Sequence, residues 1–186
     1  MEKSLSKLLK NAGEFSEDEI VLLKQELQYK ELKKGECVLE KGNICSTIYF
    51  VISGSFYEYN LDSDLEKNVI DLFTENDWVL NHKSFTSRKP SQNTIQAFEE
   101  STVYELSIES IHKLIALSQN FLQMGKILDT AVSRINFFDN NNTPDEKYEC
   151  ILKTRPVLIQ KFPQKFIASY LKITPETLSR VRKRIQ

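Results

Sequence analysis

The sequence has few of the residues that define several special classes of protein. It contains 3 cysteines, 5 glycines and 5 prolines among 186 residues. This scarcity of glycine and proline excludes collagen-like and low-complexity chains. Cys37, Cys45 and Cys150 are too few and too widely spaced for a disulfide framework, a CxxC motif or a zinc site. We therefore expect reduced thiols and no metal site.

Long hydrophobic runs are also missing. The amino-terminal segment EKSLSKLLKN has no apolar signal-peptide core, and no window approaches the ~18 uncharged apolar residues of a membrane span. The chain is 40% hydrophobic and 27% charged, which is enough apolar material for one or two compact domains. We expect a cytoplasmic protein without a membrane partner.

The net charge of −1 hides an uneven distribution of charge along the chain. Residues 147–186 contain ten basic and two acidic residues, a net charge of +8, which leaves −9 for the rest. A basic end on an acidic protein indicates contact with a polyanion at that end. A solvated basic helix explains the same charge, so charge alone does not decide between the two.

Three textures follow one another along the chain. Residues 5–27 have helical periodicity, and Ser16 with Glu19 forms the pattern of a capping box. Residues 32–106 contain short β-rich runs separated by Gly, Asn, Asp and Ser, which predict antiparallel strands in a closed or rolled sheet, with a hairpin tip at 61–64. Helical texture then resumes, with a long helix expected over 119–138.

The expected long helix carries an apolar stripe with alternating spacings of three and four residues, as in a heptad repeat. The stripe consists of Phe121, Met124, Leu128, Ala131, Ile135 and Phe138. It predicts a dimerisation helix, with Leu122, Ile127 and Val132 facing the sheet; a core helix within a monomer is the alternative. Residues 139–144 are polar and include a proline, which predicts a hinge followed by a second domain whose first helix spans about 145–155.

The last segment has the pattern of a helix-turn-helix. Ile167, Ala168 and Leu171 would pack against Leu178 and Val181 across a tight turn at 172–174. At the start of the second helix, threonine, proline and glutamate suit the N-cap, first and second positions. The polar side chains predicted to reach bases and phosphates in a major groove are Thr174, Glu176, Thr177, Ser179, Arg180, Lys183 and Arg184.

These motifs together resemble the Crp/Fnr family of bacterial transcription regulators over nearly the whole chain. Residues 41–55 are similar to the family's glycine, aromatic strand and second glycine, and Gly35 fits an earlier turn glycine. Residues 167–168 and 174–181 are similar to its helix-turn-helix. The resemblance implies an α+β fold: a double-stranded β-helix, or jelly-roll-like cyclic-nucleotide-binding-type β-roll, a long dimerisation helix, and a winged-helix-like DNA-binding domain.

The resemblance also implies boundaries, partners and roles. The sensor domain with its helical lead-in would span 1–118, the dimerisation helix 119–138, the hinge 139–144 and the DNA-binding domain 145–186. Double-stranded DNA, a second copy of the chain and RNA polymerase are the implied partners. Glu176 and Arg180 match positions that read base edges, whereas Thr177 and Lys183 are expected to hold phosphates.

The sequence departs from the family where cyclic AMP would bind. Family members that bind it carry a Gly-Glu pair and later an Arg-Ser or Arg-Thr pair; here Leu80-Asn81 and Ser91-Gln92 stand at those places. Arg88 or Lys89 could swing in to replace the missing arginine, but a buried phosphate needs a fixed, bidentate partner. We therefore expect an effector pocket that does not bind cyclic AMP, with no identified cofactor, formed by Leu80, Asn81, Arg88, Ser91 and Gln92.

Other departures concern the turn, the wing and the remaining sensor types. Lys172 occupies the turn position usually given to glycine, which predicts strain, and no wing follows the second helix before Gln186. Three scattered cysteines do not supply an iron–sulfur cluster. His82, expected in a loop, and His112, expected on a helix surface, are read as ordinary residues rather than haem ligands.

Two functional readings follow from the sequence. The first is a homodimeric transcription regulator that reads a palindromic DNA site, with a sensor pocket for an unknown or lost ligand. The alternative is a β-roll protein-interaction module that no longer binds DNA. An enzyme is not expected, because the sequence has no nucleophile–base pair, metal cluster or phosphate-cradling glycine loop.

Overall fold

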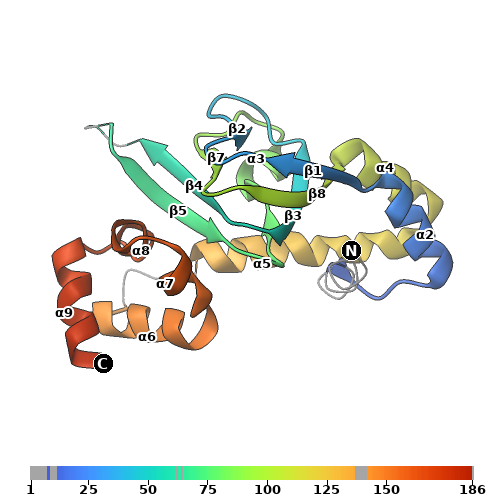
Figure 1. Ribbon diagram of the computed structural model, residues 1–186. Coiled ribbons are helices and arrows are strands. Elements are labelled where there is room, and N and C mark those ends of the chain that lie inside the picture. Colours follow the sequence, from blue (N-terminus) through green and yellow to red (C-terminus); the bar gives the residue numbers. More distant parts are fainter. Residues whose placement is uncertain (1–7, 9–11, 62, 64, 137–141, 186) are drawn as a thin grey trace.

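The computed structural model describes residues 8, 12–61, 63, 65–136 and 142–185. Antiparallel strands form a rolled double sheet, a long helix runs along one side of it, and a group of helices lies at one end (Figure 1). The strands are β1 (Gln28–Leu32), β2 (Cys37–Leu39), β3 (Thr47–Ser53), β4 (Phe56–Leu61), β5 (Lys67–Phe73), β6 (Trp78–Val79), β7 (Thr94–Ala97) and β8 (Ser101–Ser107). This is a mixed α and β fold, as predicted.

The roll consists of two four-stranded sheets, with strand orders β1-β8-β3-β6 and β2-β7-β4-β5. All the strand pairs within them are antiparallel. Phe50, Phe56 and Val103 are wholly buried where the two sheets enclose one core, and the consecutive residue Val51 is also wholly buried, so both faces of β3 are covered at this point. Gly54 turns the chain between β3 and β4 with a φ of 92°, a conformation that glycine adopts without strain.

Helices that come before, within and after the strands of the roll pack against it. These are α2 (Glu17–Glu26), α3 (His82–Ser87), α4 (Ile108–Leu117), the 3₁₀ helix η1 (Gln119–Met124) and α5 (Gly125–Asn136). The predicted capping box opens α2: the hydroxyl of Ser16 accepts from the backbone of Glu19, whose carboxylate accepts from the backbone of Ser16 at 2.8 Å. The loop predicted around His82 is instead helix α3, with Asn81 as its N-cap.

The apolar stripe predicted to form a dimer seam is buried within this chain. Phe121 is 0% exposed, Met124 5% and Ala131 2%, and Leu128 packs half-buried against the same core. This prediction is therefore wrong for these four residues, because the roll itself supplies the partner of the stripe. The side chain of Ile135, and Phe138 as a whole, lie outside the described part of the chain.

The residues expected to face the sheet are also distributed differently. Ile127 is buried against the roll and Val132 is half-buried, but Leu122 is 62% exposed. Leu122 is exposed because η1 is a 3₁₀ helix. Its repeat of three residues per turn places successive side chains in other directions than the α-helical repeat on which the prediction was based. The outer face of η1 consequently carries an exposed apolar side chain that was predicted to be covered.

The carboxyl-terminal helices form a unit of four: α6 (Pro144–Thr154), α7 (Val157–Lys161), α8 (Gln164–Tyr170) and α9 (Pro175–Ile185). The helix predicted at about 145–155 corresponds to α6, which opens with a capping box between Thr143 and Glu146. Helix α7 was not predicted. Residues 139–141 of the hinge predicted at 139–144 lie outside the described residues, and its last residue, Pro144, already belongs to α6.

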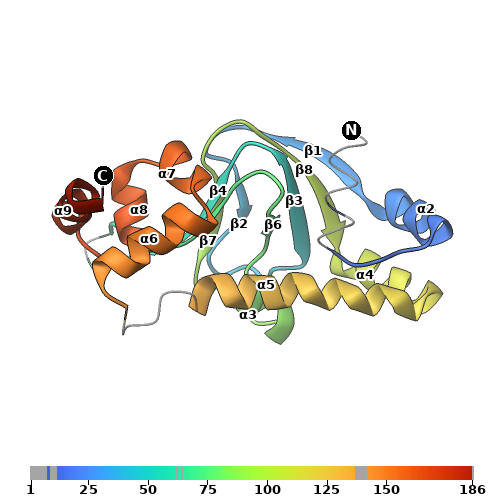
Figure 2. The same ribbon diagram turned by 90° about the horizontal axis from the view of Figure 1, so that it is seen from below.

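The unit rests on the outer face of the β4–β5 hairpin, as both views show (Figures 1 and 2). Tyr57 contacts Phe166 with ring centroids 5.0 Å apart, and the backbone N–H of Val69 donates to the hydroxyl of Ser169 at 2.8 Å. One hydrophobic cluster therefore includes residues of both the hairpin and the helices. Within the described residues, no helix is long and apolar enough to cross a membrane.

Candidate nucleic-acid interface and effector groove

The turn between α8 and α9 has the geometry of a Schellman helix ending. The backbone N–H of Ile173 donates to the carbonyl of Ala168 at 3.0 Å, and that of Lys172 donates to the carbonyl of Ser169 at 2.9 Å. Lys172 has a φ of 57°, the left-handed conformation that usually selects glycine. The strain predicted at this position is thus present in the backbone.

Helix α9 begins as its sequence predicts. The hydroxyl of Thr174 accepts from the backbone N–H of Thr177 at 3.2 Å, and Pro175 is the first helical residue. Hydrogen bonds from the Glu176 backbone N–H and the Thr174 hydroxyl lower the pKa of the Glu176 carboxyl below its usual value. Glu176 is therefore an ionised acceptor at the exposed start of this helix.

Two faces of α9 differ sharply in polarity. Leu178 and Val181 are buried against the other helices, whereas the opposite face is exposed at the edge of the molecule farthest from the roll (Figure 1). The exposed residues on this helix include Glu176, Ser179, Arg180, Lys183 and Arg184. We call them the α9 face.

Besides Thr174, three more of the predicted contact residues already have partners within the chain, namely Thr177, Arg180 and Arg184. The Arg180 guanidinium donates to the Thr177 hydroxyl at 3.2 Å, and Thr177 is half-buried. Arg184 donates to both carboxylate oxygens of Asp145 on α6, at 2.8 and 2.6 Å. Arg184 is thus held against α6, whereas Lys183 is exposed and the Arg180 side chain remains on the surface.

A second candidate site is a groove of about 750 Å³ beside α3. Its walls come from β4, α3, the loop before β7, and Val132 of α5. The volume falls in the range of small-molecule sites. Of the residues predicted for the effector pocket, Asn81, Ser91 and Gln92 line this groove.

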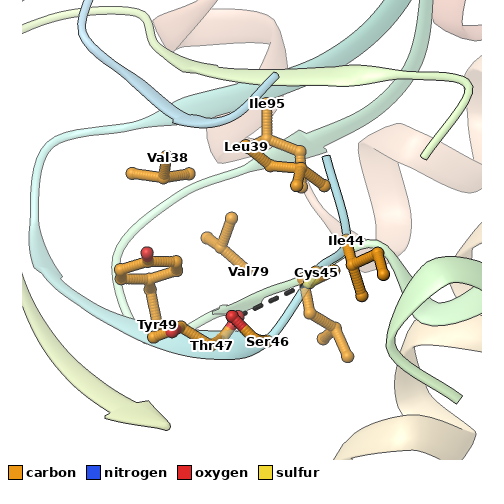
Figure 3. A pocket seen from close by; sticks show the side chains of 10 residues that line it. Val38, Leu39, Ile44, Cys45, Ser46, Thr47, Tyr49, Val79 and Ile95 are labelled. Atoms are coloured by element: carbon orange, nitrogen blue, oxygen red, sulfur yellow. Dashed lines mark hydrogen bonds between the residues drawn. The ribbon is translucent and has the colours of Figure 1, made fainter. Parts of the chain in front are cut away.

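The other two predicted pocket residues lie elsewhere. Leu80 is buried and lines a separate cavity of about 60 Å³ inside the roll, which Val38, Tyr49 and Val79 also surround (Figure 3). Arg88 ends α3 in a left-handed conformation, and its guanidinium donates to the carbonyl of Cys45 at 2.9 Å. The prediction that these two residues face an effector is therefore wrong: Leu80 fills the core, and the backbone turn at Arg88 carries its side chain to the far side of α3.

The most unusual residue of the groove is Glu58, which sequence reasoning missed. It is 1% exposed, and its Oε1 accepts from the side-chain amides of Asn81 and Asn93, each at 2.5 Å. Burial, reinforced by the nearby Asp71 carboxylate, raises the pKa of the Glu58 carboxyl to about 7. The alternation of side chains along β4 could have predicted that Glu58 is buried, because position 58 lies on the same face of the strand as the buried Phe56.

Next to the groove, buried charges connect the roll to the carboxyl-terminal unit. Asp71 of β5 pairs with Arg134 of α5 at 3.1 Å and with Arg155 at 3.8 Å. Arg155 also donates to Asp77 at 2.6 Å and to the carbonyl of Leu72 at 2.8 Å. These bonds fix the start of α7 to the end of β5.

Comparison with known proteins identifies the type of domain that the roll and its flanking helices form. Residues 29–118 match the family model of the cyclic nucleotide-binding domain. This match confirms the prediction of a cyclic-nucleotide-binding-type β-roll. No curated protein matches the sequence.

Solved structures of transcription regulators share the fold. FixK2 from Bradyrhizobium japonicum has a TM-score of 0.66 at 16% identity, with 86% of this chain and 84% of that chain covered. The catabolite activator protein of Thermus thermophilus has a TM-score of 0.57 at 14% identity, covering 92% and 84%. A protein from Eubacterium rectale described as a transcriptional regulator of the crp/fnr family has a TM-score of 0.60 at 16% identity, covering 92% and 84%. The fold of this chain is thus like that of Crp/Fnr-type regulators.

Proposed function

We propose that this protein is a DNA-binding transcription regulator of the Crp/Fnr type, not an enzyme, and that it acts as a homodimer on a palindromic duplex. The observation that carries the proposal is the α9 face: a polar, largely basic surface on an exposed helix that follows a tight turn. Residues 147–186, which include the α9 face, have a net charge of +8, and this charge favours contact with a phosphate backbone. Regulators with this fold are the structural neighbours of the chain.

The chemistry of the α9 face assigns roles to individual side chains. Arg180 is suited to donate to O6 and N7 of a guanine, and Glu176 to accept from N4 of a cytosine. Lys183 would contact phosphate as a mobile point charge, and Thr174, Ser179 and Thr177 would add hydroxyl contacts. Arg184 would reach phosphate only on its exposed side, because Asp145 holds its guanidinium.

The homodimer remains part of the proposal, although its seam differs from the predicted stripe. A two-fold DNA site requires two recognition helices one helical turn apart, about 34 Å. The stripe is occupied by the roll of the same chain, so we place the seam on the outer face of η1 and α5, where Leu122 is exposed. Sedimentation equilibrium of the wild type and Leu122→Asp tests this placement, and an unchanged mass would contradict it.

We further propose that the sensor domain does not bind cyclic AMP. The groove presents Ser91 and Gln92 where family members that bind cyclic AMP carry an Arg-Ser or Arg-Thr pair. The Arg88 guanidinium donates to the carbonyl of Cys45 instead of facing the groove. A carboxyl group, Glu58, lies at its base. A cyclic phosphate would therefore meet a negative group without a fixed positive partner.

Selection of bound sequences from a random duplex library, at two salt concentrations, tests the proposed function. We expect an inverted repeat and an affinity that falls steeply with salt. Arg180→Ala is expected to relax one base pair in each half-site, at a cost of about 1–3 kcal/mol. Lys153→Ala removes one exposed positive charge from α6 and serves as the matched control, with the preference retained.

Failure to select any sequence, with no salt-dependent binding, would refute DNA recognition. It would favour the interaction module, in which the α9 face contacts a protein instead. Equal base preference in Arg180→Ala and the wild type would refute the role of Arg180 alone. RNA polymerase is a proposed partner only if sequence-specific binding is found.

A further inference from the structure

The groove beside α3 has a negative base and a positive rim. Glu58 lies at the base, whereas Lys83 and Lys89 are exposed at the rim. A site built for a phosphate has the reverse arrangement, with its fixed positive group inside. The polarity of this groove therefore indicates another class of ligand.

Glu58 is an incompletely satisfied carboxylate. Its Oε1 accepts two amide hydrogen bonds, but its Oε2 is buried without a hydrogen-bond partner among the described residues. The same part of the chain places no lysine, arginine or histidine in an ion pair with Glu58. Burying a charged group in this way is costly unless a positive group or further donors compensate it.

The neighbouring buried carboxylate shows what such compensation looks like in this protein. Asp71 stands opposite Glu58 in the β4–β5 register, and two arginines neutralise it. Glu58 has no arginine in ion-pair contact, since Arg134 attracts it only at longer range, and it is the one of the two that faces the groove. The missing positive group would thus come from the groove side.

We propose that this groove binds a small organic cation, an amine or guanidinium compound, whose N–H groups donate to Glu58. Asn81 and Asn93 hold the carboxylate in place, and a small displacement of these amides would open Oε2 to the ligand. Lys83 and Lys89 would favour a ligand with an anionic group at its other end. The raised pKa of the Glu58 carboxyl agrees with this assignment, because a bound cation would restore the ionised form.

This inference concerns the sensor groove and does not rest on DNA binding. Isothermal titration of the full chain with putrescine, agmatine, arginine and methylguanidine tests it, with cyclic AMP and inorganic phosphate as anionic probes. We expect saturable binding of at least one cation and none of either anion. Because the readout is ligand binding alone, its failure is distinct from a failure of duplex recognition.

Two variants make the test specific. Glu58→Gln keeps the shape and the accepting oxygen but removes the charge, and it should weaken binding of the cation about 10- to 100-fold. Glu75→Gln makes the same change at an exposed position outside the groove and should bind like the wild type. Circular dichroism establishes that both variants are folded.

The proposal would be overturned by any of three results: no cation of the panel binds, Glu58→Gln binds the cation as tightly as the wild type, or cyclic AMP binds in competition with it. Equal weakening in Glu58→Gln and Glu75→Gln would also overturn it, since the attraction would then come from the net charge of the protein rather than from the groove.

Discussion

Replacing Glu58 by glutamine should stabilise the protein at neutral and higher pH. The carboxyl has a pKa of about 7 in the folded chain, against 4.5 for an ordinary glutamate, because it is buried. Each unit of difference corresponds to about 1.4 kcal/mol, so the ionised form costs about 3 kcal/mol of folding free energy above pH 7. Glutamine cannot ionise, and its carbonyl oxygen still accepts from Asn81 and Asn93.

The sign of the pH dependence follows from proton binding. Between about pH 4.5 and 7 the folded protein retains a proton at Glu58 that the unfolded chain has lost, so this residue makes the free energy of unfolding fall as pH rises. Below this window both states are protonated and the cost disappears.

Urea unfolding of the wild type and Glu58→Gln at pH 5, 6, 7 and 8 measures this effect. The difference in unfolding free energy should be smallest at pH 5 and grow to about 3 kcal/mol in favour of the variant at pH 8. Subtracting the two curves removes the contribution of the other titrating groups. A difference that stays flat, or that shrinks with rising pH, would refute the burial argument.

Three further substitutions test the backbone and the buried charges. Lys172→Gly should raise the free energy of unfolding by about 0.5–1 kcal/mol, because glycine adopts the left-handed conformation without strain. Urea unfolding measures this free energy, and a lower value in the variant would contradict the presence of strain at Lys172. Gly54→Ala should destabilise by at least about 2 kcal/mol in the same assay, since a Cβ would lie 2.7 Å from the Ser101 Cα at a φ of 92°; an unchanged midpoint would show that the turn relaxes. Asp71→Asn leaves Asp77 as the remaining carboxylate partner of Arg134 and Arg155 and should cost about 1–3 kcal/mol, which thermal unfolding would register as a lower midpoint; an unchanged midpoint would refute the importance of these pairs.

Local signals in the sequence predicted much of the backbone. Ser16 with Glu19, and Thr174 with Pro175, each specify a helix start through hydrogen bonds within a few residues. The strained turn at Lys172 was predictable for the same reason: a tight turn between two helices that are adjacent in sequence requires a residue with positive φ. Interactions of this range are encoded in neighbouring residues and need no knowledge of the tertiary fold.

Which part of the molecule covers an apolar helix face was not predictable from local signals. A stripe such as Phe121, Met124 and Ala131 specifies that one face of a helix is buried, but not whether the same chain or a second copy covers it. Helix α7 was missed because its five residues are too few for a periodic pattern. Both outcomes depend on tertiary packing.

The candidate groove was the least predictable part, since its residues come from separate strands, helices and loops. Matching the sequence to a family pattern brought Leu80 and Arg88 into the pocket, because it assumed that the phosphate-binding contacts had merely changed partners. The structure instead places a carboxyl at the base of the groove. Alternation along β4 pointed Glu58 inward, but only the fold reveals that Asn81 and Asn93 meet it there.

The position of Glu58 relates the groove to the rest of the molecule. Its cross-strand partner Asp71 lies close enough to raise the pKa of Glu58, and Asp71 is paired with Arg134 of α5 and with Arg155, between α6 and α7 of the carboxyl-terminal unit. A positive group bound at Glu58 would relieve the repulsion between the two carboxylates. Since Asp71 contributes to holding the unit on β4–β5, the charge in the groove and the attachment of the unit that carries the α9 face depend on the same small set of buried ionic groups.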